Sequence, residues 1–329
     1  MNPRLFPEAM VYSKEMRMPH PIQYQGSKRG LAPLILRYLP SKMERLVEPF
    51  AGSAAVSIAS AAHGRTKTYW LNDFNKPLAE LLGLIINHPG ELAEAYREIW
   101  SAQKPDSIEH YYQVRERFNR SHDPKEFLYL LARCVKGSVR YNTEGLFNQS
   151  PDKRRSGTQP DTMKRNIFGV SALLCGKTIV SSYDYRDVLA NVANTDIVYM
   201  DPPYQGVCGD RDSRYFTGIS IADFVAALSD LNRRDVKYAI SYDGRTGQKT
   251  FGERLPSHLN LAHIELEAGR STQATLLGRD AITVESLYLS APLSEEVGAS
   301  SIKYRRKSID QMQLLEKETR YAKVSKRVS

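Results

Sequence analysis

Four consecutive residues, Asp201-Pro202-Pro203-Tyr204, could perform chemistry on the exocyclic amino group of a flat base. They follow the apolar run at residues 196–200, which is typical of a buried strand. The prolines end the strand and leave carbonyls without ladder partners, so Asp201 and a proline carbonyl can accept both amino hydrogens. These two hydrogen bonds direct the nitrogen lone pair at an electrophilic methyl group. Tyr204 offers an aromatic face on which an extruded base can stack. The alternative interpretation of these four residues is a buried strand followed by a Pro-Pro turn.

A second strand end has the features of a nucleotide-type site. The segment from Glu48 through Phe50 to Gly52 joins a short strand, residues 45–48, to a helical run, Ser53–Ala62. Gly52 permits close backbone approach, and a helix N-terminus offers unpaired N–H groups. Asp73 ends the next strand, about 20 residues on, where an acid usually holds a ribose diol.

The cofactor expected at this turn is S-adenosylmethionine. There is no GxGxxG, because Ser53-Ala54-Ala55 follows Gly52. Nicotinamide dinucleotide binding is therefore weakly supported, and S-adenosylmethionine has no pyrophosphate to cradle. The turn taken alone could also be a structural strand-to-helix corner.

Two further segments could contact the same cofactor. Tyr24 could stack and Lys28 could pair with a carboxylate such as the methionyl end, although a polar turn before a helix is the alternative. Asp184, which follows the strand expected at Thr178–Ser182, could accept from the cofactor's adenine amino group. A helix N-cap is the alternative for Asp184.

Composition is that of a globular protein with a polyanionic partner. The 329 residues are 41% hydrophobic and 25% charged, with a net charge of +9. Such a charge favours nucleic acid, although a ribosome or membrane surface would fit equally. Cys134, Cys175 and Cys208 lack CxxC spacing, so we expect reduced thiols and no metal site. Without an apolar signal core or membrane-length run, we expect a cytoplasmic protein.

Strand and helix patterns alternate along most of the chain, which predicts an α/β fold. The alternation opens at residues 45–71 and resumes at Thr178–Ser182, Val188–Val192 and Ile197–Met200. It continues through a helix at Ile221–Leu231 and a strand at Lys237–Ser241, and a closing strand is expected at Val284–Ser290.

Residues 76–140 have helical periodicity with no intervening strand, which predicts an insertion in the sheet. We therefore expect an arm at residues 1–20, a discontinuous catalytic domain at 21–75 and 170–293, a target-recognition insertion at 76–169, and a basic tail at 294–329. The segment 140–165 is polar and contains glycines, so we expect a loop or hairpin there.

The segment from Arg133 to Arg165 is rich in cations and could bind nucleic acid. Cations neutralise phosphates, and a glycine-tipped hairpin can place side chains in a groove. A solvated charged face is the alternative. A smaller polar segment around Arg270 precedes the last strand. The expected DNA contacts are Arg133, Arg140, Asn142, Lys153, Arg154, Arg155 and Arg270.

In this order the motifs resemble the DNA adenine-N6 methyltransferase (Dam) family, the D12 or alpha-group enzymes. The resemblance runs from Gln23 to Leu289 and includes QYQGSK at 23–28, VEPFAGSAAV at 47–56, LNDFN at 71–75, YYQVRERFN at 111–119, RYNTEGLFN at 140–148 and VYMDPPY at 198–204. It implies a seven-stranded Rossmann-like sheet with a helical and hairpin target-recognition insertion. It also implies that Tyr24, Lys28, Asp73 and Asp201 contact S-adenosylmethionine or line its pocket. Ala54 stands where the family has a second glycine.

The expected activity is transfer of a methyl group from S-adenosylmethionine to a flipped adenine in a specific duplex DNA sequence. Cytosine N4 is the alternative target, and a DNA-binding protein with an inactive methyltransferase core is the alternative from another class. A nicotinamide oxidoreductase is weakened by the absent GxGxxG. Duplex DNA is the expected partner, and a cognate restriction endonuclease is left open.

Overall fold

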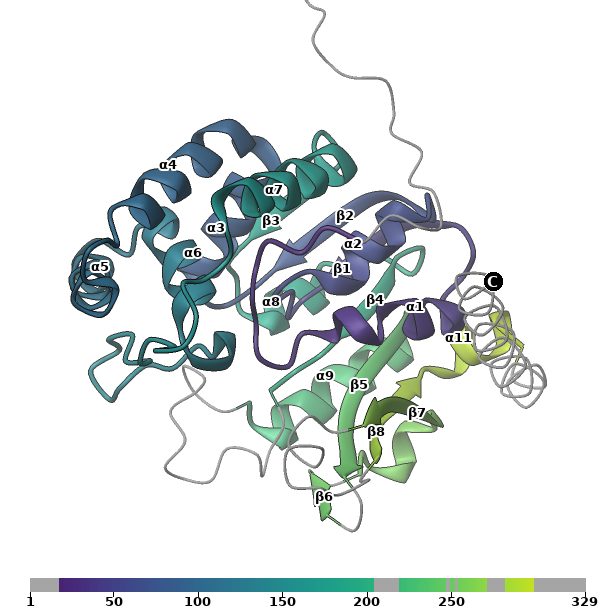
Figure 1. The fold of residues 1–329 in the computed structure, drawn as a ribbon. Coiled ribbons are helices and arrows are strands. Elements are labelled where there is room, and N and C mark those ends of the chain that lie inside the picture. The colour runs from purple at the N-terminus through teal and green to yellow at the C-terminus, as the bar shows by residue number, and fades with distance from the viewer. Residues whose placement is uncertain (1–17, 204–218, 247–248, 252–253, 271–281, 299–329) are drawn as a thin grey trace, which may run out of the picture.

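The computed structural model describes residues 18–203, 219–246, 249–251, 254–270 and 282–298. Within them the chain forms an α/β fold around one mixed sheet (Figure 1). Seven strands follow the order β3-β2-β1-β4-β5-β8-β7, and β6 pairs with β5 outside this path. Tyr204, Cys208 and most of the expected basic tail lie outside the described residues.

Strands β1 to β5 pair in parallel. β1 pairs in parallel with β2 and β4, β2 with β3, and β4 with β5, whereas β8 is antiparallel to β5 and β7. The chain order reverses at β1, so β1 and β4 form the topological switch point of the sheet. The strand bounds are β1 Met43–Glu48, β2 Thr66–Asn72, β3 Thr178–Ser181, β4 Ile197–Met200, β5 Lys237–Thr246, β6 Lys249–Phe251, β7 Ala262–Arg270 and β8 Ile282–Leu289.

Helices cover both faces of the sheet, as expected for parallel strands with crossover connections (Figure 1). Among the described residues, no helix is both long and apolar enough to span a membrane. The helix bounds are α1 Ala32–Ile35, α2 Ala55–Ala62, α3 Lys76–Asn87, α4 Pro89–Ser101, α5 Ser107–Ser121, α6 Pro124–Arg133, α7 Pro160–Leu174, α8 Tyr185–Ala190, α9 Ile221–Arg233 and α11 Ala291–Glu296. Short 3-10 turns are η1 Lys28–Gly30, η2 Leu36–Tyr38, η3 Val135–Gly137 and η4 Ser257–Leu259.

Alternate residues of the central strands enter two different cores. Leu46 of β1 and Tyr199 of β4 pack with α1 to α7, whereas Val47 and Met200 pack with α8 and α9. This follows from the two-residue side-chain period of a strand. Because both faces are covered, the central strands read as nearly continuous apolar runs.

The crossover from β2 to β3 carries α3 to α7, which form a group at the upper left of Figure 1. Their apolar residues belong to the same cluster as one face of the sheet. The sequence does not predict helix α7, since its first residues fall in the segment expected to be loop or hairpin. This helix also runs across the expected domain boundary at residue 170 and packs against α2, α3 and α4. The proposed insertion therefore shares a core with the sheet.

Most predicted strands are present, and two observed strands, β6 and β7, are not among those predicted. The strands expected around residues 45–48, 67–71, 178–182, 197–200, 237–241 and 284–290 correspond to β1, β2, β3, β4, β5 and β8. Val188–Val192 overlaps α8. Strand β7 is not among the predicted strands, although Ile264 and Leu266 alternate with polar residues and face the core. Such alternation is the pattern of a half-buried strand.

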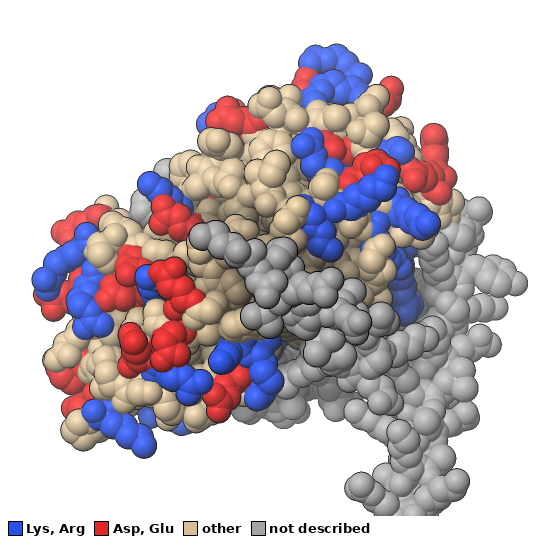
Figure 2. Space-filling model, turned by 90° about the horizontal axis from the view of Figure 1, so that it is seen from above, with Lys and Arg blue, Asp and Glu red and all other residues tan. Residues whose placement is uncertain are grey.

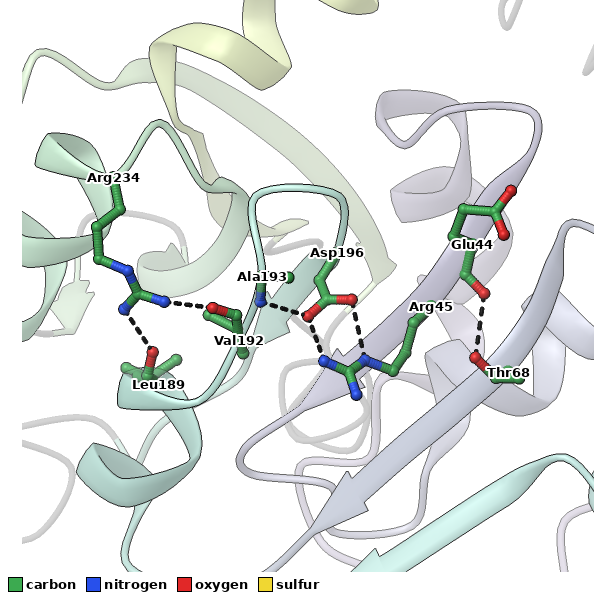
Figure 3. Close-up of polar contacts among 8 residues, drawn as sticks. All are labelled: Glu44, Arg45, Thr68, Leu189, Val192, Ala193, Asp196 and Arg234. Atoms are coloured by element: carbon green, nitrogen blue, oxygen red, sulfur yellow. Dashed lines mark hydrogen bonds and ion pairs between the residues drawn. The ribbon is translucent and has the colours of Figure 1, made fainter.

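An ion pair ties the amino end of β1 to that of β4 (Figure 3). Arg45 donates from Nε and Nη2 to the two Asp196 oxygens, at 2.9 and 2.6 Å. The amide of Ala193 donates to the same carboxylate at 2.7 Å. Nearby, Arg234 donates to the carbonyls of Leu189 and Val192 and holds the turn after α8. These contacts lie at the sheet end opposite to the polar strand ends.

We expect Asp196→Ala to lower the free energy of unfolding by about 3 kcal/mol, because it leaves Arg45 without its carboxylate and the Ala193 amide without an acceptor. The exposed Glu44, which pairs with Lys67, is the matched control, and Glu44→Ala should cost less than about 1 kcal/mol. Urea denaturation of both variants measures the difference. Equal losses would contradict the structural role of Asp196.

Candidate active site

Polar side chains gather where the parallel strands end. Glu48 is the last residue of β1, Asp73 follows β2, and Asp201 follows β4. Because the carboxyl ends of parallel strands meet at one edge, these three acids share that edge of the sheet. The sequence predicts a strand end at each of the three.

The ammonium of Lys28 joins this acidic edge. Its Nζ lies 2.8 Å from Oδ1 of Asp201 and 3.3 Å from Oε2 of Glu285, and its side chain is only 6% exposed. Burial raises the pKa of Glu285, the Asp201 charge adds to this rise, and the Lys28 charge opposes it. The sequence predicts Lys28 in the pocket but facing a cofactor carboxylate, whereas here it faces two carboxylates of the protein.

Glu48 is buried at the start of the turn between β1 and α2. One carboxylate oxygen accepts from the Ser57 amide at 2.7 Å, so Glu48 satisfies an N–H in the first turn of α2. Burial raises the pKa of Glu48 to about 7, and the neighbouring charge of Asp201 contributes to the rise. Near neutral pH, Glu48 therefore exchanges between its neutral and ionised forms.

Asp73 closes the turn between β1 and α2. Its two oxygens accept from the amides of Gly52 and Asn75, each at 2.9 Å. Burial raises the pKa of Asp73 to about 6. A Cβ on Gly52 would lie 3.5 Å from the ring of Tyr24, so Tyr24 lies directly beside this turn.

Ala54 adopts a left-handed conformation at the N-cap of α2, with φ of 53°. Glycine adopts this conformation without the steric penalty of a Cβ, which is about 1–2 kcal/mol. The replacement of the family's second glycine by Ala54 therefore has a physical consequence, because the alanine occupies a backbone conformation that favours glycine.

Asn72 links three strand ends at this edge of the sheet. Its amide nitrogen donates to the carbonyls of Pro49 and Tyr183, each at 3.0 Å. Its oxygen accepts from the Ser181 hydroxyl at 2.7 Å and the Tyr183 amide at 2.8 Å. Asn72 therefore links the ends of β1 and β3 to β2, beside Asp73. Sequence reasoning does not single it out.

Phe50 lies against α8 and α9, and Asp184 lies at the start of α8. Phe50 packs against Tyr185 and Phe224, with ring centroids 5.3 and 6.4 Å away. Asp184 caps α8 by accepting from the Arg186 amide, and pairs with the Arg186 guanidinium, which lowers the pKa of Asp184. This is the helix N-cap alternative; its contact with cofactor adenine stays a prediction.

The expected hairpin is present at residues 140–148. Tyr141 bridges Phe147, and the Asn142 amide donates to the Leu146 carbonyl at 2.9 Å. The Asn142 side-chain oxygen accepts from the amides of Glu144 and Leu146 and so shapes the tip. Arg140 is exposed at the base of the hairpin.

The hairpin and the chain after it are held by side chains from helices α4 and α5. Asn119 brackets the backbone of Phe147 with two hydrogen bonds, and Tyr111 donates to the carbonyl of Gln149. Trp100 donates to Ser156, and Tyr96 donates to Thr158. Tyr111 and Asn119 of the YYQVRERFN motif therefore hold the hairpin and the residue that follows it, whereas Trp100 and Tyr96 hold the chain just after the segment 153–155.

The structure corrects the prediction that Arg133 contacts DNA. The sequence predicts a DNA contact there, but Arg133 is 2% exposed, and its guanidinium donates to the carbonyls of Asp152, Arg155 and Ser107. A buried guanidinium has no surface to offer a phosphate, so Arg133 positions the basic segment instead. Lys153, Arg154 and Arg155, in contrast, are exposed on that segment.

Charge on the face seen in Figure 2 is mixed, since Lys and Arg side chains lie among Asp and Glu side chains in the described part. No broad basic surface among the described residues of this face marks a DNA-binding site. The hairpin at 140–148 and the segment 153–155 are therefore better guides to the DNA-binding site than the overall charge of this face. The side chain of Arg270, at the end of β7, lies outside the described residues.

The order of the strands and the polar residues at their carboxyl ends define a Rossmann-like methyltransferase fold. The sequence profile of the family described as D12 class N6 adenine-specific DNA methyltransferase matches residues 24–271. This range is well over half of the chain, and the chain belongs to that family.

Known relatives support this membership. The chain is 32% identical over 187 residues to a DNA adenine methylase of Escherichia coli (strain K12), covering 56% of this chain and 64% of that protein. It is 29% identical over 208 residues to a DNA adenine methylase of Serratia marcescens, covering 61% and 73%. A DNA N-6-adenine-methyltransferase of Escherichia phage P1 is 29% identical over 238 residues, covering 68% of this chain and 29% of that protein. The match thus spans less than two thirds of the E. coli relative.

The raised pKa of Glu48 predicts a pH-dependent stability. Between about pH 4.5 and 7 the folded protein keeps a proton that the unfolded chain releases, so this group makes the free energy of unfolding fall as pH rises. Glu48→Gln removes this dependence. We expect the variant to match the wild type near pH 4.5 and to be more stable by about 3 kcal/mol above pH 7. Urea denaturation of the apoprotein at both pH values tests this, and a constant difference would contradict it.

Proposed function

We propose that this protein transfers a methyl group from S-adenosylmethionine to the N6 amino group of adenine in a specific duplex DNA sequence. The observation that carries the proposal is the Asp201 carboxylate at the switch point, paired with Lys28 at 2.8 Å and followed by Pro202 and Pro203. Membership of the D12 class supports the choice of adenine.

Asp201 is proposed to accept a hydrogen bond from the amino group of the target base. The ammonium of Lys28 favours the ionised form of a carboxylate 2.8 Å away, and an ionised carboxylate is the stronger acceptor. A carbonyl of Pro202 or Pro203 would accept the second amino hydrogen. Tyr204, which lies outside the described residues, is proposed to stack on the extruded base.

The residues at the β1 and β2 ends fit S-adenosylmethionine. Gly52 lies in the turn between β1 and α2, the ring of Tyr24 lies beside this turn, and Asp73 places a carboxylate against the Gly52 amide. We assign Asp73 to the ribose hydroxyls, and Tyr24, Glu48 and Phe50 to the walls of the pocket. When bound, the cofactor supplies an electrophilic methyl group. The acids of this edge suit its positive charge.

Duplex DNA is proposed to meet the hairpin and the segment that follows it. Lys153, Arg154 and Arg155 are exposed and held on a backbone that Arg133 fixes, which suits contact with phosphates. Arg140 and Asn142 lie on the hairpin and are assigned to the groove. We include a cognate restriction endonuclease among the partners, because a methyl on adenine N6 alters the major-groove pattern that such an enzyme would read.

Asp201→Ala should abolish methyl transfer, because it removes an acceptor for the target amine, while leaving affinity for S-adenosylhomocysteine measurable. Sequencing DNA from cells that express the wild type, with detection of modified bases, identifies the base and the recognition sequence. Methylated cytosine in place of adenine would overturn the choice of base. Turnover by Asp201→Ala above a small fraction of the wild-type rate would overturn the role of Asp201.

Asp73→Ala should weaken binding of S-adenosylhomocysteine by about 1.5–3 kcal/mol, the range for a hydrogen bond to a charged group. Titration calorimetry measures this affinity. Asp187→Ala, which removes an exposed acid from the first turn of α8, is the control and should bind normally. Unchanged affinity of Asp73→Ala would remove Asp73 from the cofactor site.

Arg140→Ala should cost ~1–3 kcal/mol on the cognate duplex and relax discrimination at one base pair. Arg154→Ala, in contrast, should weaken binding to all duplexes alike and flatten the salt dependence. Binding of both variants to cognate and single-mismatch duplexes separates the two roles. If both variants lose affinity equally on every duplex, Arg140 does not read a base.

A further inference from the structure

We propose that Glu285 of β8 is a positioning residue for methyl transfer, which holds the Lys28 ammonium against Asp201. This role rests on the proposed function. Glu285 lies on a strand that is far in sequence from the DPPY segment. The contacts of Glu285 within the sheet support the proposed role.

Glu285 occupies a position that the strand pattern would give to an apolar residue. Leu287 and Leu289, two and four residues later on β8, are fully buried in the core shared with α1. Side chains at these spacings share one face of a strand, so Glu285 points to the same side. An acid there loses hydration, and burial accordingly raises the pKa of Glu285. Nothing in packing alone requires a carboxylate at this position.

An irregularity in the sheet lies beside Glu285. The register between β5 and β8 shifts between Ser241 and Gly244, and Gly244 is the partner of Glu285. A Cβ on Gly244 would lie 2.8 Å from the Val284 carbonyl, so only glycine allows this approach. Bulges next to active sites commonly redirect a side chain. Here the bulge lies next to the carboxylate that meets Lys28.

Lys28 needs a second partner to be held in one direction. Its flexible stem carries three donors, and one carboxylate alone leaves it able to rotate about that contact. The ammonium lies 2.8 Å from Asp201, after β4, and forms an ion pair at 3.3 Å with Glu285 of β8, whose Oε2 makes no hydrogen bond to a described residue, so the charge of Glu285 attracts the ammonium from a second direction. Because Lys28 contacts the acid assigned to the target amine, Glu285 acts on the reaction through Lys28.

Methylation of a duplex that contains the recognition sequence is measured with Glu285→Gln and with the wild type. Glutamine keeps the shape and removes the charge. At about pH 8 we expect kcat to fall by roughly 10- to 100-fold, the cost of a small misplacement of an orienting group. Affinity for S-adenosylhomocysteine and stability in urea should stay close to wild type.

The pH dependence separates this role from a purely structural one. As the pH is lowered, Glu285 takes up a proton and the wild type comes to resemble the variant, so the ratio of their kcat values should fall toward one. Among the described residues, Asp201, Lys28, Glu48 and Asp73 are also ionisable groups at this edge and are present in both proteins. A change of the ratio with pH therefore reports the charge of Glu285 and its coupling to Lys28 and Asp201. A ratio that stays constant with pH would overturn the proposal.

Two other outcomes would also overturn it: wild-type kcat in Glu285→Gln, or a loss of S-adenosylhomocysteine affinity as large as the loss of kcat, which would place Glu285 at the cofactor. Failure of the proposed function is distinguishable, because the wild type itself would then not methylate adenine. Glu265→Gln, on the neighbouring strand β7, is the control and should keep the wild-type kcat and pH profile.

Discussion

The buried ammonium of Lys28 is the contact on which the arrangement of the site depends. It joins the segment before α1 to the end of β4 and to β8, three parts of the chain that no local pattern brings together. Two carboxylates at one edge of a sheet repel each other and lose hydration there. A cation between them offsets both costs, so the edge can hold Asp201 and Glu285 side by side.

The surrounding acids show how burial and hydrogen bonding set different properties for similar groups. Glu48 and Asp73 both accept backbone N–H donors, which favours ionisation, but burial outweighs these contacts and raises the pKa of each. Asp184 lies nearer the surface, where pairing with Arg186 lowers its pKa. The site therefore combines acids that titrate near neutral pH with a cation that neutralises part of their charge.

The segment that carries the exposed cations has little regular structure, yet its backbone is fixed. Tyr96, Trp100, Tyr111 and Arg133 donate to its carbonyls from α4, α5 and α6. Bonds from side chains replace the ladder that a strand would provide, so buried carbonyls are satisfied. The same contacts explain why Gly157 has no room for a Cβ, since Arg133 lies 2.9 Å from that position.

The sequence by itself determined the order of the strand ends and the residues on them. The apolar runs ending at Glu48, Asn72 and Met200 predicted the strands, and parallel pairing then required Asp73 and Asp201 to share an edge with Glu48. Only the tertiary structure decided that Glu285 meets Lys28 and that Arg133 points inward. Local periodicity reports which face of an element is buried, but it does not report which distant residue lies against that face. The role of a charged side chain in a buried position can therefore be assigned only when the fold shows which residue it contacts.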